Sequence, residues 1–405
     1  MRCGLLGEKL GHSYSPRIHS CLADYSYELF EKTPDELSDF LIHGDYTGLN
    51  VTIPYKKAVL PYCTELSSRA KVLGAVNTLV KRSDGSIIGH NTDYFGFEFL
   101  LKKSGLDVSG KKVLVLGSGG ASVTVSAVLH SYGAQPVVIS RSGENNYENL
   151  YLHYDASVIV NATPVGMYPR IGVTPLSIEP FTSLEGVLDI IYNPARTQLL
   201  LDAERKGIVA MNGLWMLVAQ AKESAEWFLG RNLSDQVIDS IYNKLRRQME
   251  NTILIGMPGC GKSTVGPLIA RLIGKQFVDA DALIVERAGK SIPDIFNEEG
   301  EDGFRKWETA VLAELGGKSG LVIATGGGCV TREENYPALH QNGHIIWLQR
   351  DLSLLPTDGR PLSQTTALQE MYVTRKHMYE HFADHIVLNE SEPNEVAAHI
   401  AALEV

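Results

Sequence analysis

The segment GMPGCGKS at residues 256–263 constrains the fold of this chain more strongly than any other part of its sequence. It fits the pattern G-x-x-x-x-G-K-[ST], in which glycines allow backbone N–H groups to surround a phosphate. The apolar run TILI precedes it and an apolar, helix-compatible stretch follows it. This order predicts a strand, a phosphate-binding loop and a helix. Because 247 residues precede Gln248, a separate domain is expected before the loop.

The loop supplies the groups that a nucleoside triphosphate and its metal ion require. Backbone N–H groups of Gly259 to Lys262 can cradle the phosphates, the Lys262 ammonium can reach the β and γ oxygens, and the Ser263 hydroxyl can ligate Mg²⁺. We therefore expect ATP and Mg²⁺ as cofactors. The predicted nucleotide-binding residues are Gly259, Cys260, Gly261, Lys262, Ser263 and Thr264. Cys260 is interpreted as a small loop filler, because no group that would activate its thiol is evident.

A second glycine loop stands earlier in the chain, in VLVLGSGGAS at residues 113–122. It follows an apolar, β-branched run and precedes a helix-compatible segment, so residues 110–142 are predicted to form one strand–helix–strand unit. Glycines at such a turn let a pyrophosphate approach the N–H groups at the start of the helix. A tight turn without a ligand is the alternative. The predicted dinucleotide-binding residues are Gly117, Ser118, Gly119, Gly120 and Ala121.

The next strand-like run, PVVIS, indicates which dinucleotide would bind. It ends in Ser140, Arg141 and Ser142, and not in an acidic residue that would hydrogen-bond a ribose 2′-hydroxyl. A cation flanked by hydroxyl groups suits a 2′-phosphate. The sequence therefore favours NADP over NAD.

The composition is that of an ordinary globular protein, with 44% hydrophobic and 21% charged residues over 405 positions. A formal net charge of −10 argues against a nucleic-acid partner. The five cysteines lack CxxC spacing, which disfavours a zinc site or a disulfide framework and fits a cytoplasmic location. No run of 18 apolar residues occurs, so neither a membrane span nor a membrane partner is expected. No protein partner is implied.

Helical spacing of apolar residues over 221–251 predicts helices that close the first domain. We place the boundary near Gln248, which gives domains at residues 1–248 and 249–405. The basic cluster Lys244, Arg246 and Arg247 is interpreted as a solvated helix end that complements the helix dipole, with a nucleic-acid contact as the alternative. The strand-like runs of the two domains predict two separate parallel sheets.

Several polar motifs surround the first glycine loop, each at an expected turn or strand end. They are GHSYSP (11–16), GLNVTIPYKK (48–57), GAVNTL (74–79), GHNTDYFG (89–96), NATPVGM (161–167), DIIYNP (189–194) and NGLWMLVAQ (212–220). Singly, each of the first four is as compatible with a structural turn as with a binding role. Together and in this order they resemble shikimate dehydrogenase over residues 1–247. The resemblance implies a substrate lobe at about 1–92 plus 214–248 and a Rossmann-type NADP-binding lobe at about 93–213.

The resemblance also implies the residues of a site for reducing 3-dehydroshikimate. Its substrate-binding residues would be Ser13, Ser15, Thr52, Asn77, Asp93 and Gln220, with Tyr192 and Gly213 near the nicotinamide. Lys56 and Asp93 would flank the reacting carbonyl as catalytic residues. The chemistry agrees, because a lysine ammonium held by a carboxylate can stabilise the developing alkoxide and supply its proton. Lys57 is expected to point away, since adjacent residues of an extended segment face opposite sides.

The region after residue 250 contains a second set of motifs, FVDADALI (277–284), EDGFRKWE (301–308), TGGGCV (325–330), DGRPLS (358–363) and RKHMYEHFAD (375–384). With the phosphate-binding loop they resemble shikimate kinase over residues 251–405. The resemblance implies shikimate binding by Asp281, Arg305, Gly327 and Arg375, Mg²⁺ binding by Asp279 with Ser263, and an ATP contact by Arg360. Lys262 and Asp281 would be the catalytic residues.

Structural alternatives exist for several of these side chains. If Asp279 or Asp281 has only a structural role, it caps the following helix. If Arg305 has only a structural role, it pairs with Glu301 or Glu308 on its own helix. The triplet GGG at 326–328 resists a structural explanation, because three glycines cost backbone entropy unless a close approach or a positive φ requires them.

These observations predict an α/β protein in which a two-lobed, Rossmann-type dehydrogenase precedes a phosphate-loop kinase domain with a parallel sheet flanked by helices. The expected function is bifunctional: NADPH-dependent reduction of 3-dehydroshikimate, then ATP- and Mg²⁺-dependent phosphorylation of shikimate. One alternative is a kinase carrying a non-catalytic, metabolite-sensing dehydrogenase-like domain. Another is a kinase for a different small polyol.

Overall fold

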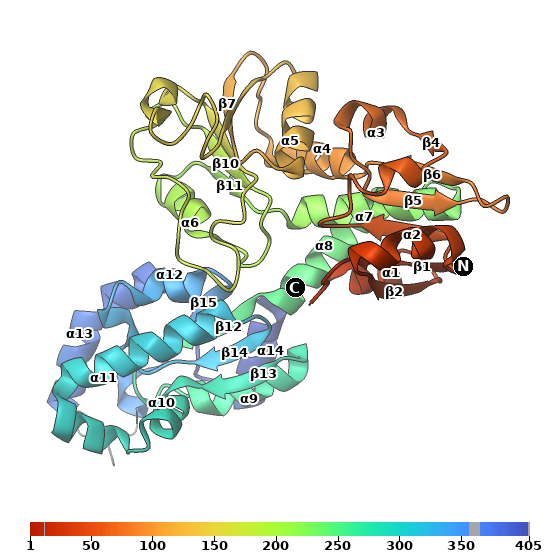
Figure 1. The fold of residues 1–405 in the computed structure, drawn as a ribbon. Coiled ribbons are helices and arrows are strands. Elements are labelled where there is room, and N and C mark those ends of the chain that lie inside the picture. Colours follow the sequence, from red (N-terminus) through yellow and green to blue (C-terminus); the bar gives the residue numbers. More distant parts are fainter. Residues whose placement is uncertain (12, 356–364, 404–405) are drawn as a thin grey trace. The chain divides into compact units, whose positions relative to one another are not determined.

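The computed structural model describes residues 1–11, 13–355 and 365–403, with only the backbone described at 365–367. The packing of the chain divides it into two units (Figure 1). Unit 1 comprises residues 1–165, 175–192 and 202–244, and unit 2 comprises residues 166–174, 193–201 and 245–405. The division of residues 1–248 into a substrate lobe and an NADP-binding lobe, and the domain boundary at 248, stay predictions.

The first part of unit 1 forms a mixed sheet of six strands in the order β2-β1-β3-β5-β6-β4. Strands β1, β2 and β3 run parallel, whereas β5 is antiparallel to both β3 and β6. The strands are β1 (Arg2–Gly7), β2 (Ser26–Glu31), β3 (Gly48–Val51), β4 (Glu65–Leu66), β5 (Thr78–Lys81) and β6 (Ile87–His90). The helices are α1 (Ser15–Leu22), α2 (Pro34–His43), η1 (Leu60–Tyr62) and α3 (Ser68–Leu73).

The second sheet of unit 1 has five parallel strands in the order β11-β10-β9-β7-β8. They are β7 (Lys112–Leu116), β8 (Gln135–Ile139), β9 (Val158–Asn161), β10 (Gly186–Asp189) and β11 (Val209–Met211). The helices of this part of the chain are α4 (Asp93–Ser104), α5 (Gly120–Ser131), η2 (Leu150–His153), α6 (Gln198–Arg205), α7 (Leu214–Leu229) and α8 (Gln236–Met249). Both α6 and α8 include residues that belong to unit 2. Strand β7, loop and α5 form the predicted strand–helix–strand unit with β8.

Unit 2 contains a five-stranded parallel sheet in the order β13-β14-β12-β15-β16. Its strands are β12 (Asn251–Ile255), β13 (Gln276–Asp279), β14 (Leu321–Ala324), β15 (Gly343–Gln349) and β16 (His385–Leu388). Its helices are α9 (Lys262–Ile273), α10 (Ala280–Ala288), α11 (Ile292–Gly317), η3 (Cys329–Thr331), α12 (Asn335–His340), η4 (Leu352–Leu354), α13 (Thr365–Phe382) and α14 (Pro393–Leu403). The predicted α/β fold with parallel sheets is confirmed, whereas the mixed six-stranded sheet was not predicted.

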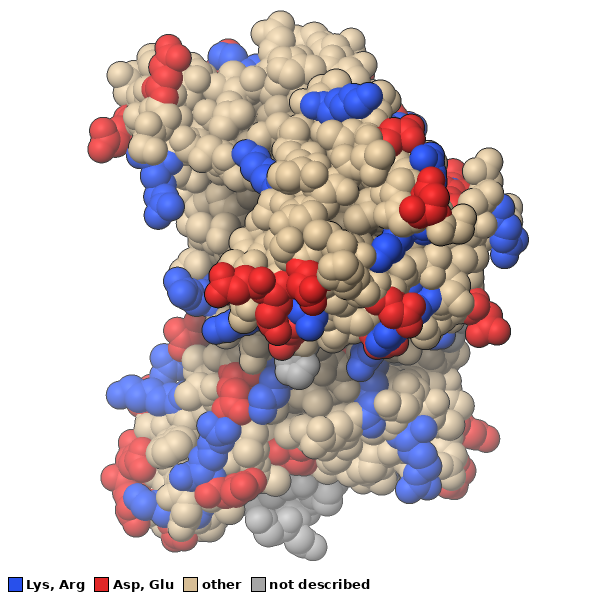
Figure 2. Space-filling model, turned by 45° about the vertical axis from the view of Figure 1, so that its right-hand side comes forward, with Lys and Arg blue, Asp and Glu red and all other residues tan. Residues whose placement is uncertain are grey.

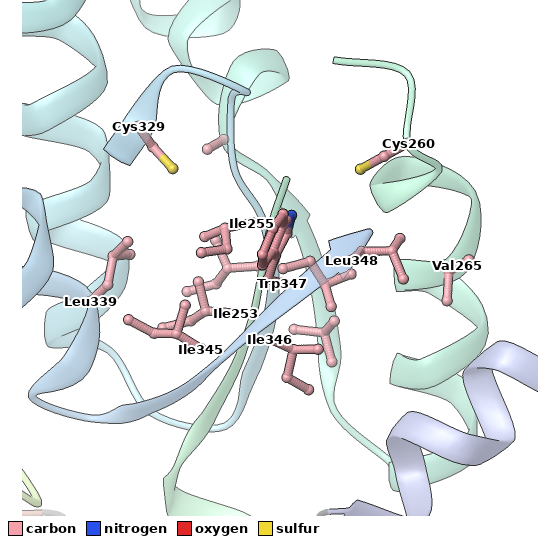
Figure 3. Packing of buried hydrophobic residues seen from close by; sticks show 14 of the residues in the cluster. Ile253, Ile255, Cys260, Val265, Cys329, Leu339, Ile345, Ile346, Trp347 and Leu348 are labelled. Carbon is pink, nitrogen blue, oxygen red and sulfur yellow. The ribbon is translucent and has the colours of Figure 1, made fainter. Parts of the chain in front are cut away.

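The core of unit 2 lies around its central strand β12, whose five residues are all buried. Central parallel strands are covered on both faces, which explains their continuous apolar runs. Ile253 pairs in register with Ile323 of β14 and Ile345 of β15. Figure 3 shows Ile253 and Ile345 below Trp347, with Cys260 and Cys329 at the upper end of the cluster.

Basic and acidic side chains are interspersed over most of the face drawn in Figure 2, in agreement with the absence of a basic excess in the sequence. Among the described residues, no helix is long and apolar enough to cross a membrane. The five cysteines are all free thiols.

A half-buried carboxylate on α7, Glu223, makes one contact of unit 1 sensitive to pH. The Arg69 guanidinium donates to Glu223 Oε1 at 2.9 Å and lies over the ring of Tyr94, 4.6 Å from its centroid. Burial raises the pKa of Glu223 to about 7, and the charge of Arg69 offsets only part of that effect. The folded protein therefore binds this proton more tightly than the unfolded chain does.

We expect Glu223 to make unit 1 less stable as the pH rises. Because the folded pKa exceeds the ordinary value of 4.5, the stabilisation is fully present below that value and is lost as the pH rises through about 7, by up to about 3 kcal/mol. Glu223→Gln should flatten this dependence. Denaturant unfolding between pH 5 and 8, monitored by hydrogen exchange in α7, measures this pH dependence of stability. Parallel pH profiles for the variant and the parent would contradict the assignment.

Candidate functional site

Lys56 and Asp93 form an ion pair in unit 1, as the sequence predicted. Lys56 follows strand β3 in a turn, and Asp93 is the first residue of α4. The Lys56 Nζ and Asp93 Oδ2 atoms are 2.6 Å apart, and the two side chains are 32% and 15% exposed. Lys57 is exposed. Residues 53–59 form turns, so the alternation expected of an extended segment does not explain the outward position of Lys57.

Asn77 is fixed next to this pair through the backbone that precedes Asp93. Its Oδ1 accepts a hydrogen bond from the Thr92 N–H at 2.7 Å, and its Nδ2 donates to Thr92 Oγ1 at 3.0 Å. Both side chains are buried. Since Thr92 and Asp93 are adjacent, the two hydrogen bonds join Asn77 to the start of α4. The predicted substrate-binding amide and the predicted catalytic carboxylate are thus brought together.

Buried hydroxyl and amide groups near Asn77 form a network that was not predicted from the sequence. The Ser224 hydroxyl on α7 lies 2.7 Å from Asn50 Nδ2, 2.9 Å from Thr78 Oγ1 and 3.0 Å from Thr92 Oγ1. Ser224 is three residues before Trp227 and four after Gln220, whose carbonyl it contacts at 2.9 Å. The signal in the sequence was weak, because Asn50 and Thr92 stand inside the quoted motifs but Ser224 does not.

The remaining predicted substrate residues of unit 1 occupy nearby elements. Ser13 Oγ accepts from the Ser15 N–H at 3.2 Å at the start of α1, and the Thr52 N–H donates to Leu6 O at 2.9 Å. Gln220 lies on α7 where that helix approaches α4, because a Cβ on Gly96 would be 3.0 Å from the Gln220 Cβ. These contacts fix the local conformation, and binding of a substrate by these four residues stays a prediction.

The first glycine loop joins β7 to α5. Gly117 has a φ of 103°, and its N–H donates to Ile139 O at 2.8 Å, which holds the loop against the end of β8. Gly119 is the N-cap of α5 and makes no side-chain cap hydrogen bond. Side chains at Gly119 and Gly120 would meet no atom within 4 Å. The start of α5 is therefore an open, uncapped helix N-terminus, which suits a pyrophosphate.

Other predicted dinucleotide-binding residues lie at the ends of neighbouring strands. Ser140, Arg141 and Ser142 directly follow β8. Ile139 at the end of the strand is buried, whereas Arg141 and Ser142 are exposed. Ser118 precedes the helix and Ala121 lies in its first turn. Tyr192 follows β10 and makes an edge-to-face contact with Tyr14, with ring centroids 6.0 Å apart.

Gly213 begins α7 at a point where no side chain fits. A Cβ there would be 2.0 Å from the Ile190 carbonyl oxygen. The Gly213 N–H donates to Ile191 O at 2.9 Å, so the chain after β11 lies directly against the chain after β10. This close approach gives a structural reason for the glycine next to the predicted nicotinamide position.

In unit 2 the phosphate-binding loop joins β12 to α9, as predicted. Gly259 and Gly261 have φ values of 82° and 103°, which residues with a Cβ rarely adopt. The buried Lys262 ammonium donates to the Gly256 and Met257 carbonyls at 2.8 and 3.1 Å. Cys260 is fully buried, in keeping with a filler role.

The predicted Mg²⁺ ligands are adjacent. Ser263 Oγ donates to Asp279 Oδ2 at 2.6 Å. Asp279 also caps α10, because its Oδ1 accepts from the N–H groups of Asp281 and Ala282. The capping alternative is therefore observed together with the contact to Ser263. A hydroxyl and a carboxylate oxygen fit Mg²⁺, which uses one or two protein oxygens and completes its shell with water and phosphate.

The glycine triplet at 326–328 lies against the charged side chains predicted to bind the acceptor. A Cβ on Gly326 would be 2.9 Å from Asp281 Oδ1, and one on Gly328 would be 2.2 Å from Arg305 Nη2. Arg375 Nη1 donates to the Gly327 carbonyl at 3.1 Å, and the Tyr379 hydroxyl donates to the same oxygen. The loop thus brings together Asp281, Arg305 and Arg375 from three different helices.

Arg305 is held by two carboxylates of its own helix. Its Nη1 donates to Glu308 Oε2 at 2.7 Å and its Nη2 to Glu301 Oε1 at 3.1 Å. Glu308 is fully buried, and burial raises the pKa of its carboxyl group although the Arg305 charge opposes the shift. Both pairings named as structural alternatives are therefore present, and they orient the guanidinium beside the glycine triplet. From the sequence, Glu308 was expected only as a competing partner of Arg305, and its buried position beside Gly326 was not predicted.

The predicted ATP contact Arg360 lies outside the described residues, as does His12 of the GHSYSP motif. Thr264 is in the first turn of α9, where its N–H donates to Gly261 O at 3.0 Å. Gly327 approaches the phosphate-binding loop, because a Cβ there would be 2.6 Å from Pro258 Cδ. The acceptor-side and nucleotide-side loops of unit 2 are therefore neighbours.

Comparison with known proteins gives the two halves of the chain their families. A shikimate dehydrogenase (NADP(+)) of Clostridium perfringens is 34% identical over 265 residues, which span 60% of this chain and 97% of the relative. The chain belongs to the shikimate dehydrogenase family. The family model for the shikimate dehydrogenase substrate binding domain matches residues 5–79, and that for shikimate kinase matches residues 258–403. Both resemblances seen in the sequence are confirmed.

Other relatives agree with this assignment. The enzyme of the same name from Caldicellulosiruptor bescii is 36% identical over 269 residues, covering 59% of this chain and 93% of the relative. The structure of a chorismate mutase/shikimate 5-dehydrogenase fusion protein from Clostridium acetobutylicum has a TM-score of 0.57 at 38% identity, with 60% of this chain and 96% of the other covered. The Thermus thermophilus shikimate 5-dehydrogenase in complex with NADP(H) and shikimate has a TM-score of 0.55 at 29% identity, with 60% and 99% covered.

We expect Gly328→Ala to weaken shikimate binding by the kinase domain. The added Cβ would collide with the Arg305 guanidinium, which its pairing with Glu308 prevents from moving freely. The KM for shikimate should rise by about tenfold or more, while the KM for ATP changes little. Steady-state kinase assays measure both constants, and the dehydrogenase activity of the same preparation serves as a concentration control. An unchanged KM for shikimate would contradict this placement of Arg305.

Proposed function

We propose that this chain catalyses two reactions in sequence: reduction of 3-dehydroshikimate to shikimate with NADPH, and phosphorylation of shikimate to shikimate 3-phosphate with ATP and Mg²⁺. The observation that carries the proposal is that a shikimate dehydrogenase and a shikimate kinase domain occur in one chain. The product of the first reaction is the acceptor of the second. Both belong to the biosynthesis of aromatic amino acids.

In the dehydrogenase reaction, hydride from NADPH would add to the carbonyl carbon of 3-dehydroshikimate. The carbonyl oxygen gains negative charge as the hydride arrives, and the Lys56 ammonium would stabilise it and donate the proton that completes the alcohol. Asp93, 2.6 Å from Lys56 Nζ, orients the ammonium. We propose that Ser13, Ser15, Thr52, Asn77 and Gln220 hold the hydroxyl and carboxylate groups of the substrate. The uncapped start of α5 and Arg141 would hold the NADP phosphates.

In the kinase reaction, Asp281 would orient the 3-hydroxyl of shikimate for in-line attack on the γ-phosphoryl group. Arg305 and Arg375 suit bidentate capture of the substrate carboxylate. Lys262 would neutralise charge on the phosphate oxygens, and Mg²⁺ supplies further charge neutralisation when Ser263 and Asp279 hold it. The contact between Gly327 and Pro258 supports the proposal, because it places the acceptor loop next to the nucleotide loop.

The two alternatives have less support. A purely sensing first domain has no need for the Lys56–Asp93 ion pair, which the structure contains. A kinase for another polyol is disfavoured by the match of residues 258–403 to the shikimate kinase model. The free thiols and the NADPH-dependent biosynthetic reaction fit a cytoplasmic enzyme that acts on small molecules.

We expect substitutions of two lysines to separate the activities. Lys56→Met should lower the dehydrogenase kcat by about 10²- to 10⁴-fold, because it removes the proton donor, and should leave the kinase rate unchanged. Lys262→Met should do the reverse, because it removes the ammonium from the phosphate-binding loop. NADP⁺ reduction with shikimate and ADP release with shikimate are the two assays.

Lys57→Met is the matched control for Lys56→Met, because it removes the adjacent, exposed ammonium. Its dehydrogenase kcat should stay within about twofold of the parent, as is usual for exposed positions away from the chemistry. Equal losses in the Lys56 and Lys57 variants, or NADP⁺ reduction that survives in the Lys56 variant, would contradict the assigned proton donor.

A further inference from the structure

Asn389 contacts the phosphate-binding loop from the edge strand of the unit 2 sheet. Strand β16 pairs with β15 up to Leu388, and the Asn389 N–H then donates to Gln349 O at 2.7 Å. The side chain is 7% exposed. Its Nδ2 donates to the Cys260 carbonyl oxygen at 2.7 Å. A buried carboxamide outside every quoted motif is thus hydrogen-bonded to the backbone of the loop.

This hydrogen bond fixes the orientation of one peptide group of the loop. A trans peptide is planar, so its C=O and N–H bonds point in opposite directions. Holding the Cys260 carbonyl toward Asn389 therefore directs the Gly261 N–H to the opposite side of the loop. Gly261 is the N-cap of α9, and no side chain caps that helix. Its N–H is one of the donors expected to bind phosphate.

The loop also lies tightly against the ends of β15 and β16. A Cβ on Gly261 would be 2.4 Å from Asn389 Nδ2, and one on Gly256 would be 2.4 Å from the Leu348 carbonyl oxygen. The Asn389 carboxamide therefore fills the space next to the glycine whose N–H it orients. It does so from the side of the peptide opposite to that N–H.

We propose that Asn389 is a positioning residue for ATP binding by the kinase domain. Its carboxamide holds the Cys260–Gly261 peptide so that the Gly261 N–H is directed to a phosphate oxygen, and the side chain itself contacts no substrate. The inference rests on the proposed kinase function. It adds a residue whose effect is expected on the nucleotide, because the Asn389 side chain donates to Cys260 of the phosphate-binding loop.

A second buried asparagine provides a matched control. Asn335 Nδ2 donates to the Cys329 carbonyl oxygen at 2.7 Å, and the residue is fully buried. The two side chains thus make the same kind of hydrogen bond, at the same length, to a cysteine carbonyl in the same unit. They differ in the loop that they contact, because Cys329 directly follows the glycine triplet.

The test compares Asn389→Ala, Asn389→Asp and Asn335→Ala in the full chain. Asn389→Ala should raise the KM for ATP by about threefold to tenfold, the usual effect of one lost hydrogen bond. Asn389→Asp should raise it further, because an isosteric carboxylate cannot donate and faces the Cys260 carbonyl. The KM for shikimate should change by less than about twofold in both, as expected when the lost interaction is local to the nucleotide. Asn335→Ala should leave the KM for ATP unchanged.

The order of the two Asn389 variants separates positioning from packing. A side chain that only fills space would tolerate the isosteric aspartate better than alanine, which would overturn the proposal. So would a parallel rise of both KM values, an Asn335→Ala effect on ATP as large as that of Asn389→Ala, or failure of both Asn389 variants to fold. Calorimetric binding of MgADP should show the same order of affinities. If the parent chain binds MgADP but does not phosphorylate shikimate, the proposed kinase function is wrong. The calorimetric affinities for MgADP still test in that case whether Asn389 positions the phosphate-binding loop.

Discussion

Parallel strand pairing positions the glycine loops of both units. Parallel strands end at the same edge of a sheet, so the loops that follow them are neighbours whatever their separation in the sequence. In unit 1 this places Gly117 next to the residues after Ile139, through the hydrogen bond between them. In unit 2 it places the phosphate-binding loop after β12 beside the glycine triplet after β14 and beside Asn389 after β16. Lys56 and Asp93 of unit 1 come instead from its mixed sheet, where Lys56 follows β3 and Asp93 begins α4.

Close backbone approach is the second requirement, and glycines meet it at defined points. The triplet at 326–328 lies against a carboxylate, a guanidinium and the phosphate-binding loop, all within distances that a Cβ would violate. The buried charges that it contacts need partners, since an unpaired buried charge is strongly destabilising. Arg305 and Glu308 provide this pairing for each other. The same ion pair holds the guanidinium beside the glycine triplet.

Much of this arrangement was predictable from the sequence, because the motifs define both the loop and the strand before it. The phosphate-binding loop, the glycine loop after β7 and the Lys56–Asp93 pair are where the motifs predicted them. Glu308, Ser224 and Asn389 were not predicted, because their importance comes from burial and from contacts between distant segments.

Local reasoning also failed where the backbone differed from the expected form. Lys57 was expected to point away because of strand alternation, but its segment forms turns. The mixed sheet of unit 1 was not predicted, because its short strands lack a long apolar run. The structural alternatives assumed one contact for each side chain, and the structure shows more. Asp279 caps α10 and also accepts from Ser263, and Arg305 pairs with both Glu301 and Glu308.

The central claim is that one chain reduces 3-dehydroshikimate and phosphorylates the product. The most direct measurement incubates the purified chain with 3-dehydroshikimate, NADPH, ATP and Mg²⁺, and follows NADPH oxidation by absorbance and shikimate 3-phosphate by mass spectrometry. We expect shikimate 3-phosphate to form only when both NADPH and ATP are present, with one NADPH and one ATP consumed per product. NADPH oxidation without phosphorylated product, or ATP consumption that does not depend on shikimate, would contradict it.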